Sequence, residues 1–441
     1  MTPELITLFM FATMMVLLFT GQRVFGVIGF VGSAAGLWLW GNGAVEMPFN
    51  QAFQVLNWYP LITVPFFVFM GYMMSESGIA SNLYRMFHVW FGPIRGGLAL
   101  GTMGLMVLIS CINGLSVAGM AIGATIALPE LLRRGYDKIM VTGVVQGGSS
   151  LGILVPPSVV LVLFAMIARA PITELWLAGI MPGLLMATIF GIYIYVRCRI
   201  QPEMGPPIDP EELAQYTMRD KLLLLREGTM PVAVFAIMMT LFLTGITSLT
   251  ESSVVGAVLA TIAAALSGRL NWQILESTTR NTLLISCMFL WIILGALCFS
   301  SVYDGLGAVR AIENLLLNTF GLDPWGILIL MLLSFVVMGM FLDDTAMLVI
   351  VAPLYIPLVR ILGFDLIWFG ILYTITCQIA YITPPFGYNL FLMRAMAPPE
   401  ITLADIYRSI LPFVLMMVLT VILLMVFPQI ALWLPGLYSG R

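Results

Sequence analysis

The sequence predicts an all-α protein that crosses a membrane many times. Hydrophobic residues occupy 61% of the 441 positions and charged residues only 9%, whereas a soluble domain carries roughly 25% charged residues. The mean hydropathy is +1.04. Apolar runs of about 20 residues, each sufficient for a ~30 Å hydrocarbon core, recur along the chain. We therefore expect a multi-pass protein embedded in a lipid bilayer.

Individual residue types narrow the possible chemistry. His88 is the only histidine, which excludes a histidine-based metal site or catalytic dyad. The five cysteines stand in apolar segments without CxxC spacing, so we expect buried thiols rather than disulfides or metal ligands. The first twenty residues lack a basic region and a cleavage site, which indicates a retained membrane helix. We expect neither enzymatic activity nor a nucleic-acid partner.

Each half of the chain combines full crossings with one pair of half-length apolar pieces and one segment interrupted by Pro-Pro. The half-length pieces are too short to cross, so each pair predicts a re-entrant hairpin, and each Pro-Pro predicts a broken helix. The hairpins are expected at 98–130 and 325–361, and the broken helices at 139–169 and 366–396. Full crossings are expected at 5–20, 24–40, 55–75, 174–197, 229–247, 252–267, 281–301 and 409–427.

These segments group into scaffold regions and two transport units. In chain order we expect N-terminal scaffold helices (1–78), a first transport unit (79–200), a cytoplasmic linker with an amphipathic helix (201–227), second-half scaffold helices (228–305), a second transport unit (306–427) and a periplasmic C-terminal tail (428–441).

The distribution of basic residues predicts the orientation. With the N-terminus outside, fifteen of the 19 Lys and Arg residues fall on the cytoplasmic side, as the positive-inside rule requires. Only Arg169, Arg310, Arg360 and Arg441 fall outside. This orientation places both termini in the periplasm and opens the two hairpins to opposite sides, so the two halves are expected to be inverted.

A shift of 228 residues superimposes the first half on the second without a gap. It brings Pro156-Pro157 onto Pro384-Pro385, and it also matches Pro129 with Pro357, Gly135 with Gly363 and Asp137 with Asp365. An inverted repeat with paired broken helices indicates a secondary transporter whose binding site lies near the midplane.

The prolines also explain why helices would break inside a membrane. A break leaves carbonyls and amides without helical partners, and lipid cannot satisfy them. Such groups persist where protein, water or a bound ion takes them over, and freed carbonyls suit a small hard cation such as sodium. Glycines in "QGGSSLGIL", before Pro156, permit close approach of backbone oxygens to an ion.

The motifs at these breaks resemble those of one transporter family. The first half contains "INGLSVAGMAIGATIALPELLRRGYDK" and "GGSSLGILVPPS", and the second contains "GMFLDDTAMLVIVAPLYIP" and "ITPPFGYNLF". Together they resemble the large membrane subunit of TRAP (tripartite ATP-independent periplasmic) transporters over nearly the whole chain. The first tip departs from the serine-richer pattern of that family at Asn113 and Leu115.

The resemblance implies an elevator-type permease of the bacterial inner membrane that imports a small organic acid, a carboxylate, with sodium as the coupling ion. It implies a soluble periplasmic substrate-binding protein and a small four-helix membrane subunit as partners. Because the chain starts directly with the first hairpin of the large subunit, we expect the small subunit to be a separate protein.

The resemblance also implies two sodium sites, one per hairpin, and a substrate site between the tips. The first sodium site would use Asn113, Ser116 and carbonyls of Gly152, Val155 and Pro157. The second would use Asp344 and Thr345 with carbonyls of Ala380, Thr383 and Pro385. Substrate would contact Gly114, Ser158 and Asn389.

Simpler roles remain open for several of these polar residues. Asn113 and one of the pair Asp343 and Asp344 could cap half-helices instead of, or as well as, binding an ion. Gln146 and Gln378 could line a cavity, although we favour a role in tying helices together. For Asp137 and Asp365 we favour a role in a turn or at a helix start.

Two other functions compete with the tripartite permease. A stand-alone ion-coupled carboxylate symporter would have similar helices, but the motifs favour the TRAP family. An intramembrane aspartyl protease needs two carboxylates from separate helices that share a proton. Asp343 and Asp344 are neighbours on one tip, and no midplane aspartate faces them from the other half, so we reject a protease.

Overall fold

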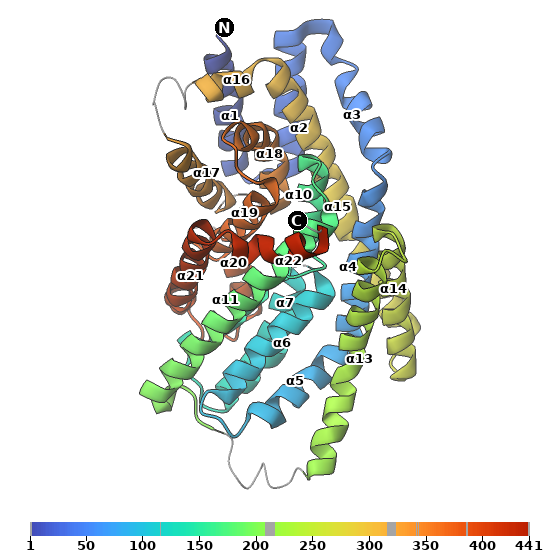
Figure 1. The fold of residues 1–441 in the computed structure, drawn as a ribbon, viewed down its shortest axis with the longest axis vertical. Coiled ribbons are helices and arrows are strands. Elements are labelled where there is room, and N and C mark those ends of the chain that lie inside the picture. Colours follow the sequence, from blue (N-terminus) through green and yellow to red (C-terminus); the bar gives the residue numbers. More distant parts are fainter. Residues whose placement is uncertain are drawn as a thin grey trace.

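The computed structural model describes residues 2–114, 116–207, 217–314, 323–340, 342, 344–384 and 387–439. Its regular structure is helical, and these ranges contain no strand. Figure 1 shows an elongated molecule in which long helices flank a centre built from short ones. The predicted all-α class is confirmed.

The first half contains eleven α-helices among the described residues. They are α1 (Pro3–Phe19), α2 (Val24–Ala35), α3 (Met47–Leu56), α4 (Thr63–Glu76), α5 (Ile79–Phe91), α6 (Gly97–Asn113), α7 (Ser116–Ile122), α8 (Leu128–Arg133), α9 (Lys138–Ser150), α10 (Val159–Ala168) and α11 (Ile172–Ile200). A π-helical turn, Gly36–Trp40, extends α2, and another, Gly123–Ala127, joins α7 to α8.

The described part of the second half has similarly long and short helices. They are α13 (Met218–Leu243), α14 (Leu249–Leu266), α15 (Trp272–Gly305), α16 (Ala308–Glu313), α17 (Pro324–Gly339), α18 (Asp344–Ile361), α19 (Leu366–Tyr381), α20 (Tyr388–Met396), α21 (Leu403–Val426) and α22 (Gln429–Ser439).

Five described helices, α11, α13, α14, α15 and α21, are long and apolar enough to cross a membrane, and a bent pair adds a sixth. The bent pair replaces the single crossing expected at 55–75. There α3 and the segment Tyr59–Glu76 meet at 66°, because Pro60 cannot continue the preceding helix.

Two further segments are more continuously helical than expected. The amphipathic helix of the linker and the crossing at 229–247 form one helix, α13, which starts at a capping box of Thr217 and Asp220. Its one internal proline, Pro231, does not end it. The expected C-terminal tail is also largely helical, because α22 packs against α11.

The short helices end and restart at the predicted breaks. Helices α6 and α7 flank the first hairpin tip, and α17 and α18 flank the second. The first Pro-Pro separates α9 from α10, and the second break separates α19 from α20. Helix α7 packs against α20, and α18 packs against α10, so each hairpin contacts the half-helix that follows the break in the other half of the chain.

Aromatic side chains fill the core between the halves. Phe164 of α10 stacks on Tyr373 of α19 at a centroid distance of 5.9 Å, and Tyr373 meets Phe335 of α17 edge-on at 4.8 Å. All three side chains are fully buried. This apolar packing joins the first broken helix to the second hairpin, and within a bilayer it stabilises through van der Waals contact between the helices.

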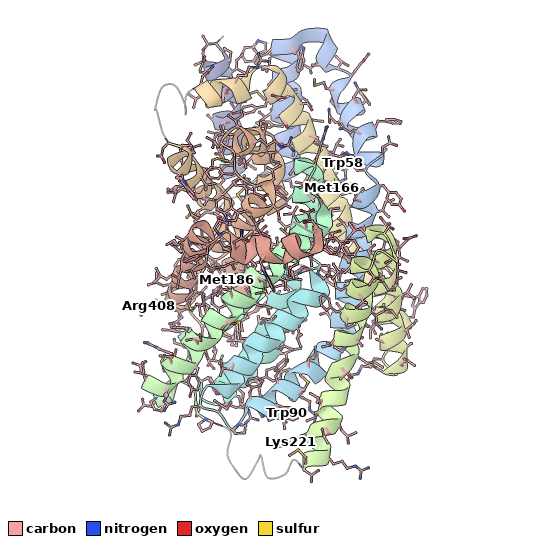
Figure 2. The ribbon with its side chains drawn as sticks, viewed as in Figure 1. Trp58, Trp90, Met166, Met186, Lys221 and Arg408 are labelled. Carbon is pink, nitrogen blue, oxygen red and sulfur yellow. The ribbon has the colours of Figure 1, made fainter. Side chains whose placement is uncertain are left out.

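The ends of the helices fit the expected orientation. The C-terminal end of α11 and the N-terminal end of α13, both basic, lie at the lower end of Figure 1, opposite α16 and the N-terminus. At that lower end the Trp90 indole donates to the Lys221 carbonyl at 3.4 Å (Figure 2). The orientation itself, and the periplasmic position of both termini, stay predictions.

Candidate functional site

The first break is built by prolines that remove donors. Pro156 and Pro157 have no N–H, so the carbonyls of Gly152 and Ile153 lack the donors that a continuous helix would supply four residues on. The Val155 amide, the last one before the prolines, still bonds to the Leu151 carbonyl at 3.0 Å as in a helix. The break therefore leaves backbone oxygens of a fully buried segment turned away from helical geometry.

The tip of the first hairpin lies directly against this break. Gly114 has φ +61°, and a Cβ added to it would lie 2.1 Å from the carbonyl oxygen of Pro157. Only glycine permits both this backbone conformation and this approach. The structure thus brings together the tip and the Pro157 carbonyl, two of the predicted ligand positions.

The Ser158 side chain hydrogen-bonds to backbone groups on both sides of the break. Its hydroxyl donates to the Ile153 carbonyl and accepts from the Leu161 amide, which makes it the N-cap of α10. The Trp176 indole donates to the Ser158 carbonyl at 3.3 Å. Its predicted contact with substrate stays a prediction, because the described contacts of its side chain lie within the break.

A buried polar cluster joins the first tip to the second half. The Asn389 side chain of α20 donates through Nδ2 to the Ser116 hydroxyl of α7 at 2.9 Å and to the Ser149 hydroxyl of α9 at 3.5 Å. All three residues are at most 3% exposed. Ser116 and Asn389 were predicted to bind different ligands, and the structure places them in contact.

Ser149 was missed as a site residue, although "QGGSSLGIL" had been singled out for its glycines. Its hydroxyl also donates to the Gln146 carbonyl at 2.9 Å. Nothing in the sequence indicated this role, because the contact with Asn389 depends on how α9 packs against α20.

The second break also arises where proline removes a backbone hydrogen-bond donor. Pro384 removes the amide that would bond to the Ala380 carbonyl, and the Thr383 amide bonds to that carbonyl instead at 3.2 Å. The Thr383 carbonyl accepts from the Gly387 amide at 3.2 Å. Helix α17 approaches closely here, because a Cβ on Gly339 would lie 2.6 Å from the Ala380 Cβ.

Some predicted site positions are described in part or not at all. Asp343 and Pro385 lie outside the described residues. Of Asn113, Asp344 and Thr345 the structure describes the backbone only: Asn113 ends α6, and the other two begin α18.

The favoured role of Asp137 and Asp365 as helix starts is confirmed. Asp137 caps α9 by accepting from the Met140 amide at 2.8 Å, and Asp365 caps α19 by accepting from the Ile367 and Trp368 amides at 2.8 and 3.0 Å. The glycines two residues earlier, Gly135 and Gly363, have φ +77° and +76°. The offset of 228 residues therefore relates matching local structures.

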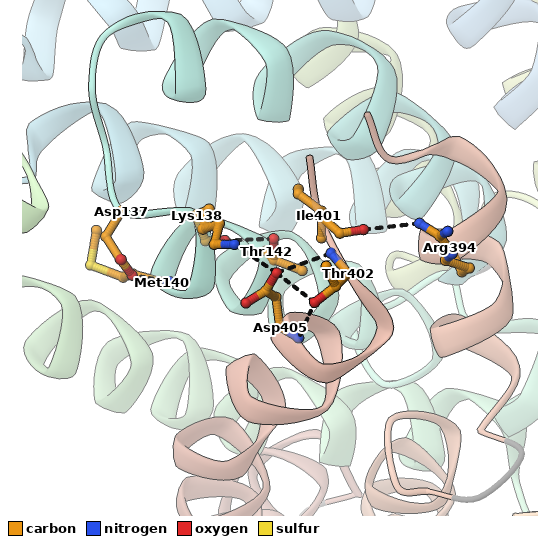
Figure 3. Close-up of polar contacts among 8 residues, drawn as sticks. All are labelled: Asp137, Lys138, Met140, Thr142, Arg394, Ile401, Thr402 and Asp405. Atoms are coloured by element: carbon orange, nitrogen blue, oxygen red, sulfur yellow. Dashed lines mark hydrogen bonds and ion pairs between the residues drawn. The ribbon is translucent and has the colours of Figure 1, made fainter. Parts of the chain in front are cut away.

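Helices α9 and α21 form a second contact between the halves (Figure 3). Lys138 Nζ lies 2.8 Å from Asp405 Oδ2, and the same oxygen accepts from the Thr402 amide and hydroxyl in a capping box of α21. Farther along, Gln146 Nε2 donates to the Ser409 hydroxyl at 3.0 Å. This supports the favoured role of Gln146 in tying helices together.

We expect Asp405→Ala to lower the free energy of unfolding by about 1–2 kcal/mol. The substitution removes the Asp405 half of the capping box of α21 and the ion pair of Asp405 with Lys138. Thermal unfolding in detergent measures the effect. The matched control is Asp220→Ala, which removes the capping box of α13 without an ion pair to a distant helix. Equal losses in the two variants would show that the Lys138 pair contributes nothing.

One known protein family matches most of the chain. The family described as "Tripartite ATP-independent periplasmic transporter, DctM component" matches residues 11–430. The chain belongs to this family. The resemblance seen in the hairpin and Pro-Pro motifs is thereby confirmed, and the chain is a TRAP large permease protein.

Characterised TRAP permeases match along most of their length. The C4-dicarboxylate TRAP transporter large permease protein DctM of Pseudomonas aeruginosa is 28% identical over 88% of each chain. The ectoine/5-hydroxyectoine large permease protein UehC of Ruegeria pomeroyi is 28% identical over 98% of this chain and 99% of its own. The sialic acid permease protein SiaT of Haemophilus influenzae is 26% identical, and the match covers 61% of its length.

Solved structures of similar fold are also transporters. The Alcanivorax borkumensis YdaH transporter superimposes with a TM-score of 0.58 at 16% identity and covers 92% of this TRAP permease and 89% of its own chain. Neisseria gonorrhoeae MtrF gives a TM-score of 0.61 at 15% identity over 90% and 85% of the two chains. At these identities the likeness concerns the fold alone.

Proposed function

We propose that this chain is the large subunit of a sodium-coupled transporter that imports a small organic acid into a bacterial cell across the inner membrane. Its proposed partners are a separate small four-helix membrane subunit and a soluble periplasmic substrate-binding protein. Family membership and relatives named for C4-dicarboxylate, ectoine and sialic acid transport support this proposal.

The donor set around the first break suits sodium. Gly114 at the tip touches the Pro157 carbonyl, and the Gly152 carbonyl lacks its helical donor. A hard cation prefers such oxygens, together with the Ser116 hydroxyl and, by the family motif, Asn113 and the Val155 carbonyl. Among the described residues no group of three His, Cys, Asp or Glu could hold a metal ion, so backbone carbonyls would dominate.

The second proposed site repeats this arrangement at the equivalent positions. It would use the Ala380 and Thr383 carbonyls, and the family motif adds Asp344, Thr345 and Pro385. The Thr383 carbonyl accepts one backbone amide, that of Gly387, and has a second lone pair for an ion. The Ala380 carbonyl accepts from the amides of Ile382 and Thr383. The substrate would lie between the tips, near Gly114, Ser158 and Asn389.

An elevator mechanism is proposed because the two transport units contact each other reciprocally. Helix α7 packs against α20, and α18 against α10, so hairpins and broken helices of both halves interlock. A body held together in this way would move through the scaffold as one unit.

Sodium coupling is energetically sufficient. Each net charge moved inward gains about 2.3 kcal/mol per 100 mV, and a tenfold sodium gradient adds about 1.4 kcal/mol per ion. Two sodium ions with a monoanion would give roughly 5 kcal/mol, which supports accumulation on the order of thousands-fold. The sequence contains no Gly-rich P-loop that would indicate ATP use.

Uptake into proteoliposomes tests the proposal. The vesicles contain this chain and its small partner, with an inward sodium gradient imposed and the binding protein present or omitted. Uptake that needs both sodium and the binding protein is expected. Uptake with sodium alone would indicate a stand-alone symporter, and uptake without sodium would overturn the coupling.

We expect Asp344→Ala to weaken the apparent sodium affinity by at least about tenfold, because it removes a proposed ligand of the second site. The sodium dependence of uptake measures the change. Asp365→Ala is the control: it deletes the cap of α19 and should lower thermal stability by about 1 kcal/mol with an unchanged sodium response. An unaltered sodium response of Asp344→Ala would remove Asp344 from the site.

A further inference from the structure

Gln378 of α19 makes a contact that the proposed function does not use. Its side-chain Nε2 donates to the carbonyl oxygen of Ser150, the last residue of α9, at 3.0 Å. Both residues are fully buried, and the Oε1 of Gln378 has no hydrogen-bond partner in the structure. Because Ser150 O is an acceptor, it fixes the amide with its nitrogen toward the first half.

The carbonyl that Gln378 contacts is one of the last carbonyls of α9, at the junction with the 3-10 turn Leu151–Ile153. The last four carbonyls of a helix lack helical donors. The amide of Leu154, which could have bonded to Ser150, bonds instead to the Leu151 carbonyl at 3.1 Å. A side chain from the other half of the protein thus caps the helix that leads into the first break.

Gln378 and Ser150 are 228 residues apart, which is the offset that relates the two halves. In the repeat expected from the sequence, Gln378 is therefore the counterpart of the residue that it contacts. Gly152 follows Ser150 by two residues, and Ala380 follows Gln378 by two, so this bond connects the backbones at both proposed ion sites.

We propose that Gln378 is a positioning residue that couples the two sodium sites, an inference that rests on the proposed function. A cation that draws in the carbonyls of one break shifts the end of α9 or α19. The bond between Gln378 and Ser150 transmits that shift to the other break across a dry interface, where an amide–carbonyl bond is strong. Binding of the first ion then favours binding of the second.

Gln146 provides a matched control. It is also fully buried and has an unpartnered Oε1, but its Nε2 donates to the Ser409 hydroxyl on α21 rather than to the end of a broken helix. Gln378→Met and Gln146→Met each replace the amide by an apolar chain of similar length. Both lose buried hydrogen bonds of the amide, which for Gln146 include a long one of 3.5 Å to the Thr142 carbonyl. Only the first variant loses the link between the sites.

Sodium binding to the purified full-length protein, followed by isothermal titration calorimetry with choline as the control cation, tests the inference. We expect cooperative binding by the unmodified chain, with a Hill coefficient that falls from about 2 toward 1 in Gln378→Met and stays unchanged in Gln146→Met. The apparent affinity of Gln378→Met should weaken about 3- to 10-fold. Gln378→Asn, whose shorter side chain cannot reach Ser150, should behave in the same way and serves if the methionine variant does not fold.

The outcomes separate this inference from the proposed function. Sodium binding that is cooperative in both the unmodified chain and the Gln378 variants would overturn the coupling role alone. Non-cooperative binding by the unmodified chain would do the same and leave the sodium sites intact. A chain that binds no sodium would overturn the proposed function, and the inference with it.

Discussion

Gly114→Ala is expected to abolish sodium-driven uptake. The added methyl would lie 2.1 Å from the Pro157 carbonyl oxygen, at a backbone φ of +61°. The left-handed conformation costs about 1–2 kcal/mol for a non-glycine residue, and overpacking adds about 1–3 kcal/mol. Because the clash falls between the hairpin tip and the break, the tip must move away from the proposed ligands. Uptake and sodium affinity should fall by about 100-fold or more.

Gly135→Ala separates the clash from the backbone strain. Gly135 has φ +77°, and a Cβ there would meet nothing within 4 Å, so this variant carries the strain alone. It should lose some thermal stability and keep its sodium affinity. If Gly114→Ala transports as well as Gly135→Ala, the tip does not need its close contact with Pro157.

Asn389→Leu is expected to reduce uptake by about 10- to 100-fold. The substitution removes the amide partner of the buried Ser116 hydroxyl, whereas the Ser149 hydroxyl keeps its bond to the Gln146 carbonyl. An unsatisfied buried group costs about 1–3 kcal/mol. It also frees the first tip from α20. Uptake in proteoliposomes measures the loss, and thermal unfolding shows how much of it reflects stability.

A double-mutant cycle locates this effect in the cluster. Ser116→Ala combined with Asn389→Leu should be less damaging than the sum of the single changes, with a coupling of about 1 kcal/mol. Ser334→Ala is the control partner, because its hydroxyl pairs with Tyr355 and should combine additively with Asn389→Leu. Additivity in both pairs would show that Ser116 and Asn389 act independently.

The sequence alone was sufficient to predict the role of a residue whose contacts are with backbone groups a few positions away. Asp137 and Asp365 follow a positive-φ glycine by two residues and cap the next helix, a pattern with few alternatives. The Pro-Pro pairs likewise mark where α9 and α19 give way to α10 and α20, because each pair removes two consecutive amide donors. A single proline does not suffice, since Pro231 stands inside the unbroken α13.

Contacts between distant residues could not be predicted in this way. The Ser116, Ser149 and Asn389 cluster, the Lys138–Asp405 pair and the Gln378–Ser150 bond each join the two halves of the chain. Ser149 and Ser150 are ordinary small residues in an apolar segment, and their spacing does not reveal which helix will face them. The packing of α22 against α11 could not be predicted from the sequence either.

The sequence by itself determined the membrane class, the two breaks, the 228-residue offset and the family, because hydropathy, missing amide donors and motif spacing act along the chain. Only the tertiary structure decided that the tip at Gly114 meets Pro157, and that Gln378 contacts the end of α9 at Ser150. The physical reason is that these contacts depend on how helices pack, and apolar residues permit many packings until close approach at glycines and buried hydrogen bonds select one.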